Sequence, residues 1–115
     1  MTAIKLDGLA TAITIKAELA QRVIELKKKG ITPGLGTILV GDDPGSHAYV
    51  ASKHRDSAEI GMHSIRIDLP ANASSADVRS AINDLNEADD VHGFIVQLPL
   101  PFGLDTNQML ELVNP

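Results

Sequence analysis

Three side chains in this sequence are of types and spacings that could act together on a small molecule. Tyr49 and Lys53 are four residues apart in a segment with helical character, so their Cβ atoms lie about 6 Å apart on one helix face. Gln97 interrupts the apolar run FIVQLP, where burying an amide without a partner would cost about 1–3 kcal/mol. An amine beside an aromatic ring can exchange protons, an amide can orient that amine, and the ring can stack on a flat heteroaromatic ligand.

Each of these residues also has an ordinary structural interpretation. An aromatic residue at helical spacing is more often a core or boundary residue than a stacking platform, and a single helical lysine is usually a solvated charge. Gln97 is the least ordinary of the three, because an amide within an apolar strand needs a partner. The functional interpretation therefore depends on Tyr49, Lys53 and Gln97 lying close together, and not on any one of them alone.

Other residues in the sequence give weaker indications of a functional site. His47 and His54 are seven residues apart and share a helix face, but no third ligand at metal spacing accompanies them, so we expect no metal site. The GLG at residues 34–36 lacks the third glycine of the dinucleotide fingerprint and precedes a strand instead of following one. DDPG at residues 42–45 is typical of a turn rather than a cation site. We expect no nucleotide-phosphate site within this sequence.

Composition narrows the class of protein. The chain has 115 residues, 43% of them hydrophobic, which is enough for one core and too few for two. A net charge of −5 argues against nucleic acid or an anionic membrane as the main partner. There is no cysteine, which suits a reducing cytoplasm. No apolar run approaches the length of a membrane span, and Lys5, Asp7 and Lys16 interrupt any secretory signal.

Amphipathic patterns predict four helices that would carry these residues. The first is expected at residues 11–29, with Gly30 as its stop, and the second at residues 49–60, with Ser46 as its N-cap. A third opens at residues 74–77, and a short fourth begins at Asp105 or Thr106. The side chains expected to face the core are Ile15, Leu19, Val23 and Leu26 in the first helix, Val78, Ile82 and Leu85 in the third, and Met109, Leu110 and Val113 in the fourth.

Three strands are expected between these helices. They cover residues 35–40, an alternating segment around residues 65–69, and residues 93–98. Strands that alternate with helices favour an α/β fold, here a three-layer α-β-α sandwich around a mainly parallel sheet. Ligands of such sheets bind at the carboxyl ends of the strands. There the loops GDDPGS and QLPLP would bring Tyr49, Lys53 and Gln97 together.

Two longer motifs resemble one family. Residues 40–53 read VGDDPGSHAYVASK and match the pattern V-G-D-x-P-x-S-x-x-Y-V-x-x-K, and residues 96–101 read VQLPLP. Over essentially its whole length the chain resembles the N-terminal, folate-binding half of the bifunctional methylenetetrahydrofolate dehydrogenase/methenyltetrahydrofolate cyclohydrolase family (FolD type). A chance match to both motifs, in order and at this separation, is very improbable.

The resemblance implies roles for individual residues. Lys53 matches the catalytic lysine, a proton shuttle for the cyclohydrolase step that also helps to position the folate. Tyr49 matches the tyrosine that packs against the folate rings, and Gln97 the glutamine that hydrogen-bonds the lysine. Val96 and Leu98 match backbone and wall contacts of the folate pocket.

The resemblance also implies a reaction and a setting. Methylenetetrahydrofolate is oxidised to methenyltetrahydrofolate with NADP and then hydrolysed to formyltetrahydrofolate, by a cytoplasmic homodimer of one-carbon metabolism that serves purine, methionine and histidine biosynthesis. In the family a K-D-x-D-G segment, which binds the pterin ring, and a Rossmann-like NADP domain follow this half. We expect residues 1–115 to be the folate-binding catalytic domain, truncated at its C-terminal end, with NADP bound mainly elsewhere.

Two other functions are compatible with the same sequence. The chain could be a non-catalytic folate-binding module or an interaction scaffold. It could also be the substrate domain of a different α/β dehydrogenase, since this architecture serves many functions. The two matched motifs argue against the dehydrogenase interpretation, and a folate titration separates the enzyme half from the scaffold.

Overall fold

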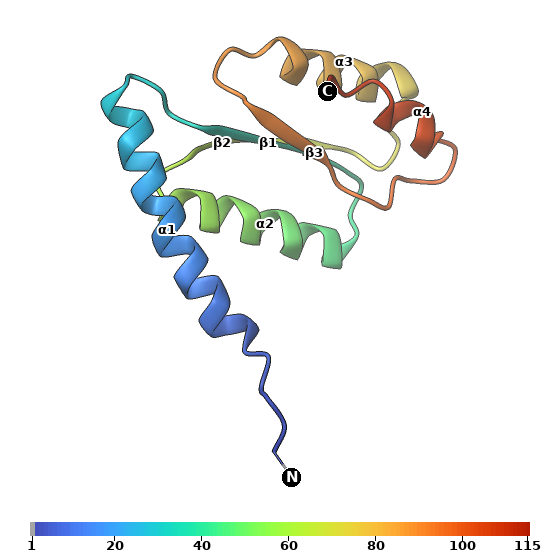
Figure 1. The fold of residues 1–115 in the computed structure, drawn as a ribbon. Coiled ribbons are helices and arrows are strands. Elements are labelled where there is room, and N and C mark those ends of the chain that lie inside the picture. Colours follow the sequence, from blue (N-terminus) through green and yellow to red (C-terminus); the bar gives the residue numbers. More distant parts are fainter. Residues whose placement is uncertain (1) are drawn as a thin grey trace.

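A computed structural model describes residues 2–115 as a parallel sheet with helices on both of its faces (Figure 1). This arrangement confirms the predicted α/β class and its alternation of helices and strands. The elements in chain order are α1 (Gly8–Lys28), β1 (Gly34–Val40), α2 (Pro44–Glu59), β2 (His63–Leu69), α3 (Ser75–Glu87), β3 (Gly93–Val96) and α4 (Thr106–Leu110).

The sheet has the strand order β2-β1-β3, and both pairs of neighbours are parallel. In this register Thr37 in the central strand lies opposite Arg66 on one side and Ile95 on the other. Helix α2 covers one face of the sheet and α3 the other, which confirms the three layers (Figure 1). β3 ends at Val96, two residues earlier than predicted, because prolines at 99 and 101 have no N–H to continue the ladder.

The hydrophobic core lies between the sheet and α3. The predicted stripe of α3 is buried there, and α3 begins with a capping box in which Ser74 and Asp77 exchange hydrogen bonds. In α4 the prediction is confirmed for Met109, which is buried, and wrong for Leu110, which is 37% exposed because the five-residue helix has only one inward position. The buried members of the cluster are Ile38, Val40, Val78, Ala81, Ile82, Leu85, Val96 and Met109.

Helix α2 begins earlier than the sequence suggested. Asp43 is its N-cap and accepts the backbone N–H of Ser46 at 2.8 Å, with Pro44 in the first helical turn. The prediction of Ser46 as the N-cap is wrong, because Ser46 lies inside the helix with its side chain buried. The preceding turn depends on Gly41, whose φ of +100° is strained for any residue with a Cβ.

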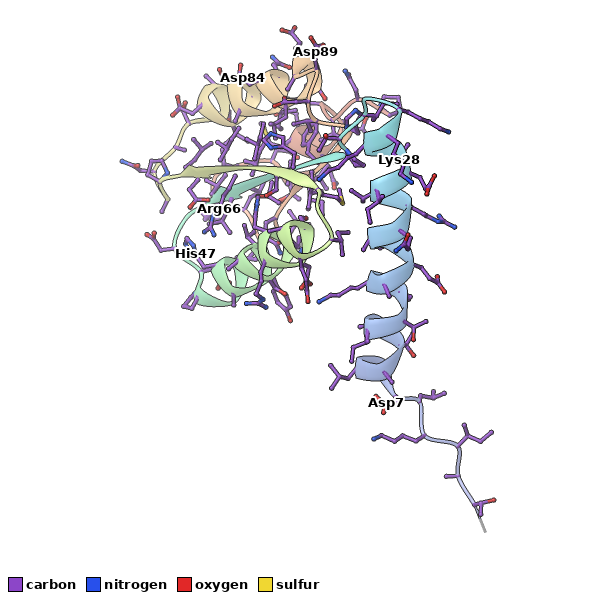
Figure 2. All side chains as sticks on the ribbon, turned by 90° about the vertical axis from the view of Figure 1, so that its left-hand side faces the viewer. Asp7, Lys28, His47, Arg66, Asp84 and Asp89 are labelled. Atoms are coloured by element: carbon purple, nitrogen blue, oxygen red, sulfur yellow. The ribbon has the colours of Figure 1, made fainter. Side chains whose placement is uncertain are left out.

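Helix α1 projects past the body of the molecule (Figure 2). Val23 is its only buried residue among those described, while Ile15 is 48% and Leu19 38% exposed. The predicted core-facing stripe is therefore wrong for Ile15 and Leu19, because α1 turns a different face, the one with Lys16 and Ala20, toward α2. No helix within residues 2–115 has the length and apolar character needed to cross a membrane.

Candidate active site

The rotation of α2 decides which of its side chains reach each edge of the sheet. Ser46, Val50 and Ser57 are buried and form the innermost line of the helix. At 100° per residue, Tyr49 and Lys53 lie on one flank of this line, toward β3. His47 and His54 lie on the other flank, toward β2. One helix therefore presents two different polar edges to the sheet.

Lys53 is the centre of the β3 flank. Its Nζ donates to Oε1 of Gln97 at 3.4 Å and lies 5.6 Å from the centroid of the Tyr49 ring. The structure thus brings together the three residues that the sequence singled out from two distant segments. Tyr49 is 66% exposed, so its ring is a free surface and not a core contact.

The amide of Gln97 is held in one orientation. Its Nε2 donates to the carbonyl oxygen of Leu98 at 3.1 Å, which leaves Oε1 directed toward the amine of Lys53. The hydroxyl of Ser46 donates to the same carbonyl at 3.3 Å and ties the start of α2 to the end of β3. The Leu98–Pro99 peptide bond at this position is cis. The amide of Gln97 therefore has the hydrogen-bond partners that its position in an apolar run requires.

The two predicted wall residues, Val96 and Leu98, have different environments. Leu98 is 43% exposed and can supply a side-chain contact. The side chain of Val96 is buried in the core on the α3 face, so only its backbone can contribute. Ile95 lies two residues before Gln97, on the same face of β3, and is 40% exposed. Sequence reasoning missed Ile95, although strict alternation from Gln97 would have indicated it.

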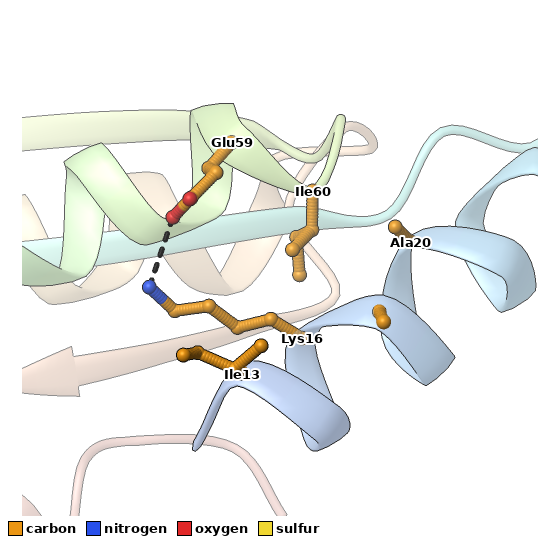
Figure 3. A pocket seen from close by; sticks show the side chains of 6 residues that line it. Ile13, Lys16, Ala20, Glu59 and Ile60 are labelled. Atoms are coloured by element: carbon orange, nitrogen blue, oxygen red, sulfur yellow. Dashed lines mark hydrogen bonds and ion pairs between the residues drawn. The ribbon is translucent and has the colours of Figure 1, made fainter. Parts of the chain in front are cut away.

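A second hollow lies between α1 and α2 (Figure 3). It has a volume of about 280 Å³, and Ile13, Lys16 and Ile60 are among its lining residues. The ammonium of Lys16 donates to Asp56 at 2.8 Å and to Glu59 at 2.9 Å. These bonds raise the pKa of Lys16 and lower that of Asp56. Because its charges already satisfy one another, this hollow is a weaker candidate than the Lys53 site.

Two motifs that the sequence raised, a metal cluster and a glycine-rich phosphate turn, can be checked in residues 2–115. Within residues 2–115 no three histidine, aspartate or glutamate side chains are grouped to hold a metal ion. A Cβ at Gly34 would collide with the backbone of Asp90, and one at Gly36 would lie 3.0 Å from Leu85 and Phe94. Packing therefore explains the two glycines, which enter β1 and do not form a phosphate-binding turn after a strand.

Comparisons with known proteins show the family of the chain. The family described as tetrahydrofolate dehydrogenase/cyclohydrolase, catalytic domain, matches residues 6–115. A bifunctional FolD methylenetetrahydrofolate dehydrogenase/cyclohydrolase from Campylobacter jejuni is 42% identical with a TM-score of 0.91, over 95% of this chain and 39% of that one.

Two eukaryotic structures are similar over the same region. The FolD enzyme of Trypanosoma brucei, solved with NADP cofactor and an inhibitor, is 36% identical with a TM-score of 0.95, over 100% of this chain and 40% of that one. A 5,10-methylenetetrahydrofolate dehydrogenase from the silkworm Bombyx mori is 34% identical with a TM-score of 0.94, over 99% of this chain and 40% of that one. The chain therefore spans about two fifths of the length of these relatives.

Proposed function

Because this chain belongs to the tetrahydrofolate dehydrogenase/cyclohydrolase family, we propose that it supplies the folate site and the catalytic lysine for both reactions of that family. These are the oxidation of methylenetetrahydrofolate with NADP and the hydrolysis of the methenyl product to formyltetrahydrofolate. The observation that carries the proposal is the placement of Lys53 between Gln97 and the exposed ring of Tyr49.

In the hydrolytic step Lys53 moves one proton. Its amine accepts a proton from water as the oxygen bonds to the methenyl carbon. The resulting ammonium donates that proton to the ring nitrogen as the carbon–nitrogen bond breaks, and the second water proton leaves to solvent as the formyl group forms. Water and the methenyl cation thus give formyltetrahydrofolate and one released proton.

The neighbouring residues bind and orient the folate. Tyr49 offers its face to the flat ring system, and Gln97 holds the amine of Lys53 in place through Oε1. Leu98 and Ile95 supply apolar wall contacts, and Val96 contributes its backbone alone. These contacts hold the reacting carbon near the amine, which is where positioning lowers the barrier.

The oxidation also needs a dinucleotide site, and the glycines of residues 34–36 enter β1 instead of forming a phosphate-binding turn. We place the NADP site outside this folate-binding catalytic domain. The greater length of the relatives and the NADP bound by the Trypanosoma brucei enzyme support that assignment. For this step the chain's own task is to hold the folate on Tyr49 with the carbon exposed.

The hydrolytic step tests the proposal, because its chemistry needs no NADP. We expect Lys53→Met to reduce the hydrolysis of methenyltetrahydrofolate by about 10²–10⁴-fold, without a matching loss of stability. Lys28→Met, at a lysine on α1 remote from the site, is the control and should keep the wild-type rate. Wild-type turnover by Lys53→Met would remove the role given to this lysine.

The alternative function is a folate-binding or scaffold fragment without catalysis. The open site supports this alternative, and so does the small share of the relatives' length that the chain covers. Titration of the protein with 5-formyltetrahydrofolate distinguishes the outcomes. Binding without hydrolysis would indicate a binding module, and no binding at millimolar concentration would indicate a scaffold.

We also propose a cytoplasmic homodimer that serves purine, methionine and histidine biosynthesis and binds neither nucleic acid nor membranes. The absence of cysteine fits a reducing compartment, and the net charge of −5 disfavours polyanionic partners. The dimer and the pathways rest on the family resemblance. Light scattering of the purified protein tests the dimer directly.

A further inference from the structure

We propose that His54 and His47 are positioning residues that fix the rotation of α2 and thereby place Lys53 against Gln97. Neither histidine belongs to the folate site described above, and both lie on the opposite flank of the helix. The kinetic part of this inference rests on the proposed function. The structural part does not.

The first anchor joins α2 to the centre of the sheet. Thr37 is the only polar side chain in β1 and is fully buried. Its Oγ1 lies 2.7 Å from Nε2 of His54, a hydrogen bond between the central strand and the inner edge of the helix. A buried hydroxyl without this partner would cost about 1–3 kcal/mol, so the pair resists any rotation that separates it.

The second anchor lies two turns earlier, at His47. Its Nε2 lies 3.2 Å from the carbonyl oxygen of Gly41, and its Nδ1 lies 3.0 Å from Nη2 of Arg66 (Figure 2). Because a carbonyl only accepts and a guanidinium only donates, the ring must be neutral with its proton on Nε2. Asp68 fixes the other side of Arg66 through Nε at 2.8 Å. The anchor thus connects α2 both to the preceding turn and to β2.

Helix α2 needs such anchors because its buried line is small. Ser46, Val50 and Ser57 offer little volume to interlock with the sheet, so packing alone fixes the rotation of the helix weakly. A rotation of about 10° moves an atom at the helix surface by about 1 Å. The bond from Lys53 to Gln97 is already 3.4 Å long, so that shift would break it.

Burial and the charge around His54 favour its neutral form. Burial lowers the pKa of His54, Arg66 on β2 lowers it further, and Asp68 partly opposes both effects. On β1, the residue that faces the His54 ring is Thr37. The guanidinium of Arg66 faces Nδ1 of His47, and Asp43 at the start of α2 is the nearby carboxylate. Acid therefore weakens the His54 anchor without touching Lys53 directly.

The kinetic test uses three variants of β1. Thr37→Val removes the hydroxyl at nearly constant volume, and we expect kcat for methenyltetrahydrofolate hydrolysis to fall by about 10–100-fold with a smaller change in KM. Thr37→Ser retains the hydroxyl and should recover most of kcat. Ile38→Val, on the opposite face of the same strand, is matched for a small core loss and should leave kcat per folded molecule unchanged.

A second measurement holds even if the protein proves inactive. ¹⁵N NMR of the side chains should show His47 as the neutral Nε2–H tautomer, and His47→Leu should shift the Gln97 amide and the Tyr49 resonances. His63→Leu, at the amino end of β2, is the control and should leave them in place. Equal kcat for Thr37→Val and Ile38→Val, or unshifted Gln97 signals in His47→Leu, would overturn the inference. A wild-type protein without hydrolysis would count against the proposed function alone.

Discussion

The two faces of the sheet in this protein are built from different chemistry. Toward α3 the strands present Ile38, Val40 and Val96, all buried in one apolar cluster. Toward α2, β1 presents Thr37 beside one buried aliphatic residue, Leu39. Thr37, Arg66 of β2 and Gln97 just after β3 are each joined to α2 by a hydrogen bond. Since neighbouring residues of a strand point to opposite faces, one short segment can serve both purposes.

This difference separates stability from chemistry. Burial of aliphatic side chains on the α3 face supplies the free energy of folding, at about 25 cal/mol for each Å² removed from water. The α2 face can then hold polar groups in fixed orientations, buried at Thr37 and partly exposed at Lys53 and Gln97, without being the main support of the fold. The following predictions test that division, from the largest expected effect to the smallest.

The largest loss of stability should come from the α3 face. Ile82 is fully buried, and Ile82→Ala should lower the free energy of unfolding by about 2–5 kcal/mol in a urea titration. Tyr49→Ala, at an exposed ring on the α2 side, should change it by less than about 0.5 kcal/mol while weakening folate binding. A reversal of these two stabilities would refute the division between the faces.

The N-cap of α3 should contribute a smaller amount. Ser74→Ala removes the side-chain oxygen that accepts the backbone N–H of Asp77 at 3.1 Å, at a cost of about 1 kcal/mol. Ser80→Ala, at an exposed position inside the same helix, should be neutral within about 0.5 kcal/mol. Both variants should bind 5-formyltetrahydrofolate as the wild type does. A loss of affinity in Ser74→Ala alone would show that the two faces are coupled.

The α2 face should respond to pH through His54. Its pKa is lowered in the folded protein from the ordinary value of 6.5, so the unfolded chain binds more protons just below that pH. Stability is therefore complete above about 6.5, falls as the pH drops below it, and levels off below the folded pKa. Denaturant titrations across this range measure the slope. His54→Gln should flatten it, and an unchanged slope would contradict the assignment.

The smallest effect should concern the attachment of α1. Lys16→Met removes the ion pairs to Asp56 and Glu59, which are the charged contacts between α1 and α2. Because these pairs are exposed, added salt should weaken them in the wild type and have less effect in the variant. Hydrogen exchange of the α1 amides reports the change. Lys28→Met, whose partner Glu25 is on the same helix, should not alter the salt dependence.

Several features were predictable because they depend on local pattern. The stripe of Val78, Ile82 and Leu85 has the helical period, and the apolar run that became β1 could only be buried. The convergence of Lys53 and Gln97 followed from the rule that parallel strands end at one edge. Each of these conclusions needs only spacing and the burial of apolar groups.

Other features depend on partners far away in the chain. Ser46 and Asp43 are both good N-cap residues. Asp43 is the N-cap of α2 because the turn at Gly41 ends directly before it. The exposure of Ile15 reflects which face α1 turns toward α2, the face with Ile13 and Lys16, and helical periodicity does not encode that choice.

By itself, the sequence determined the order of the elements, the parallel sheet and the residue types of the candidate site, because periodicity and side-chain chemistry are local properties. Only the tertiary structure decided which flank of α2 meets which strand. That choice gave Lys53 the amide of Gln97 and gave His54 the hydroxyl of Thr37. The physical reason is that contacts between a helix and the sheet set the rotation of the helix. Here these contacts join residues that are 17 positions apart (Thr37 and His54) and 44 positions apart (Lys53 and Gln97) in the chain.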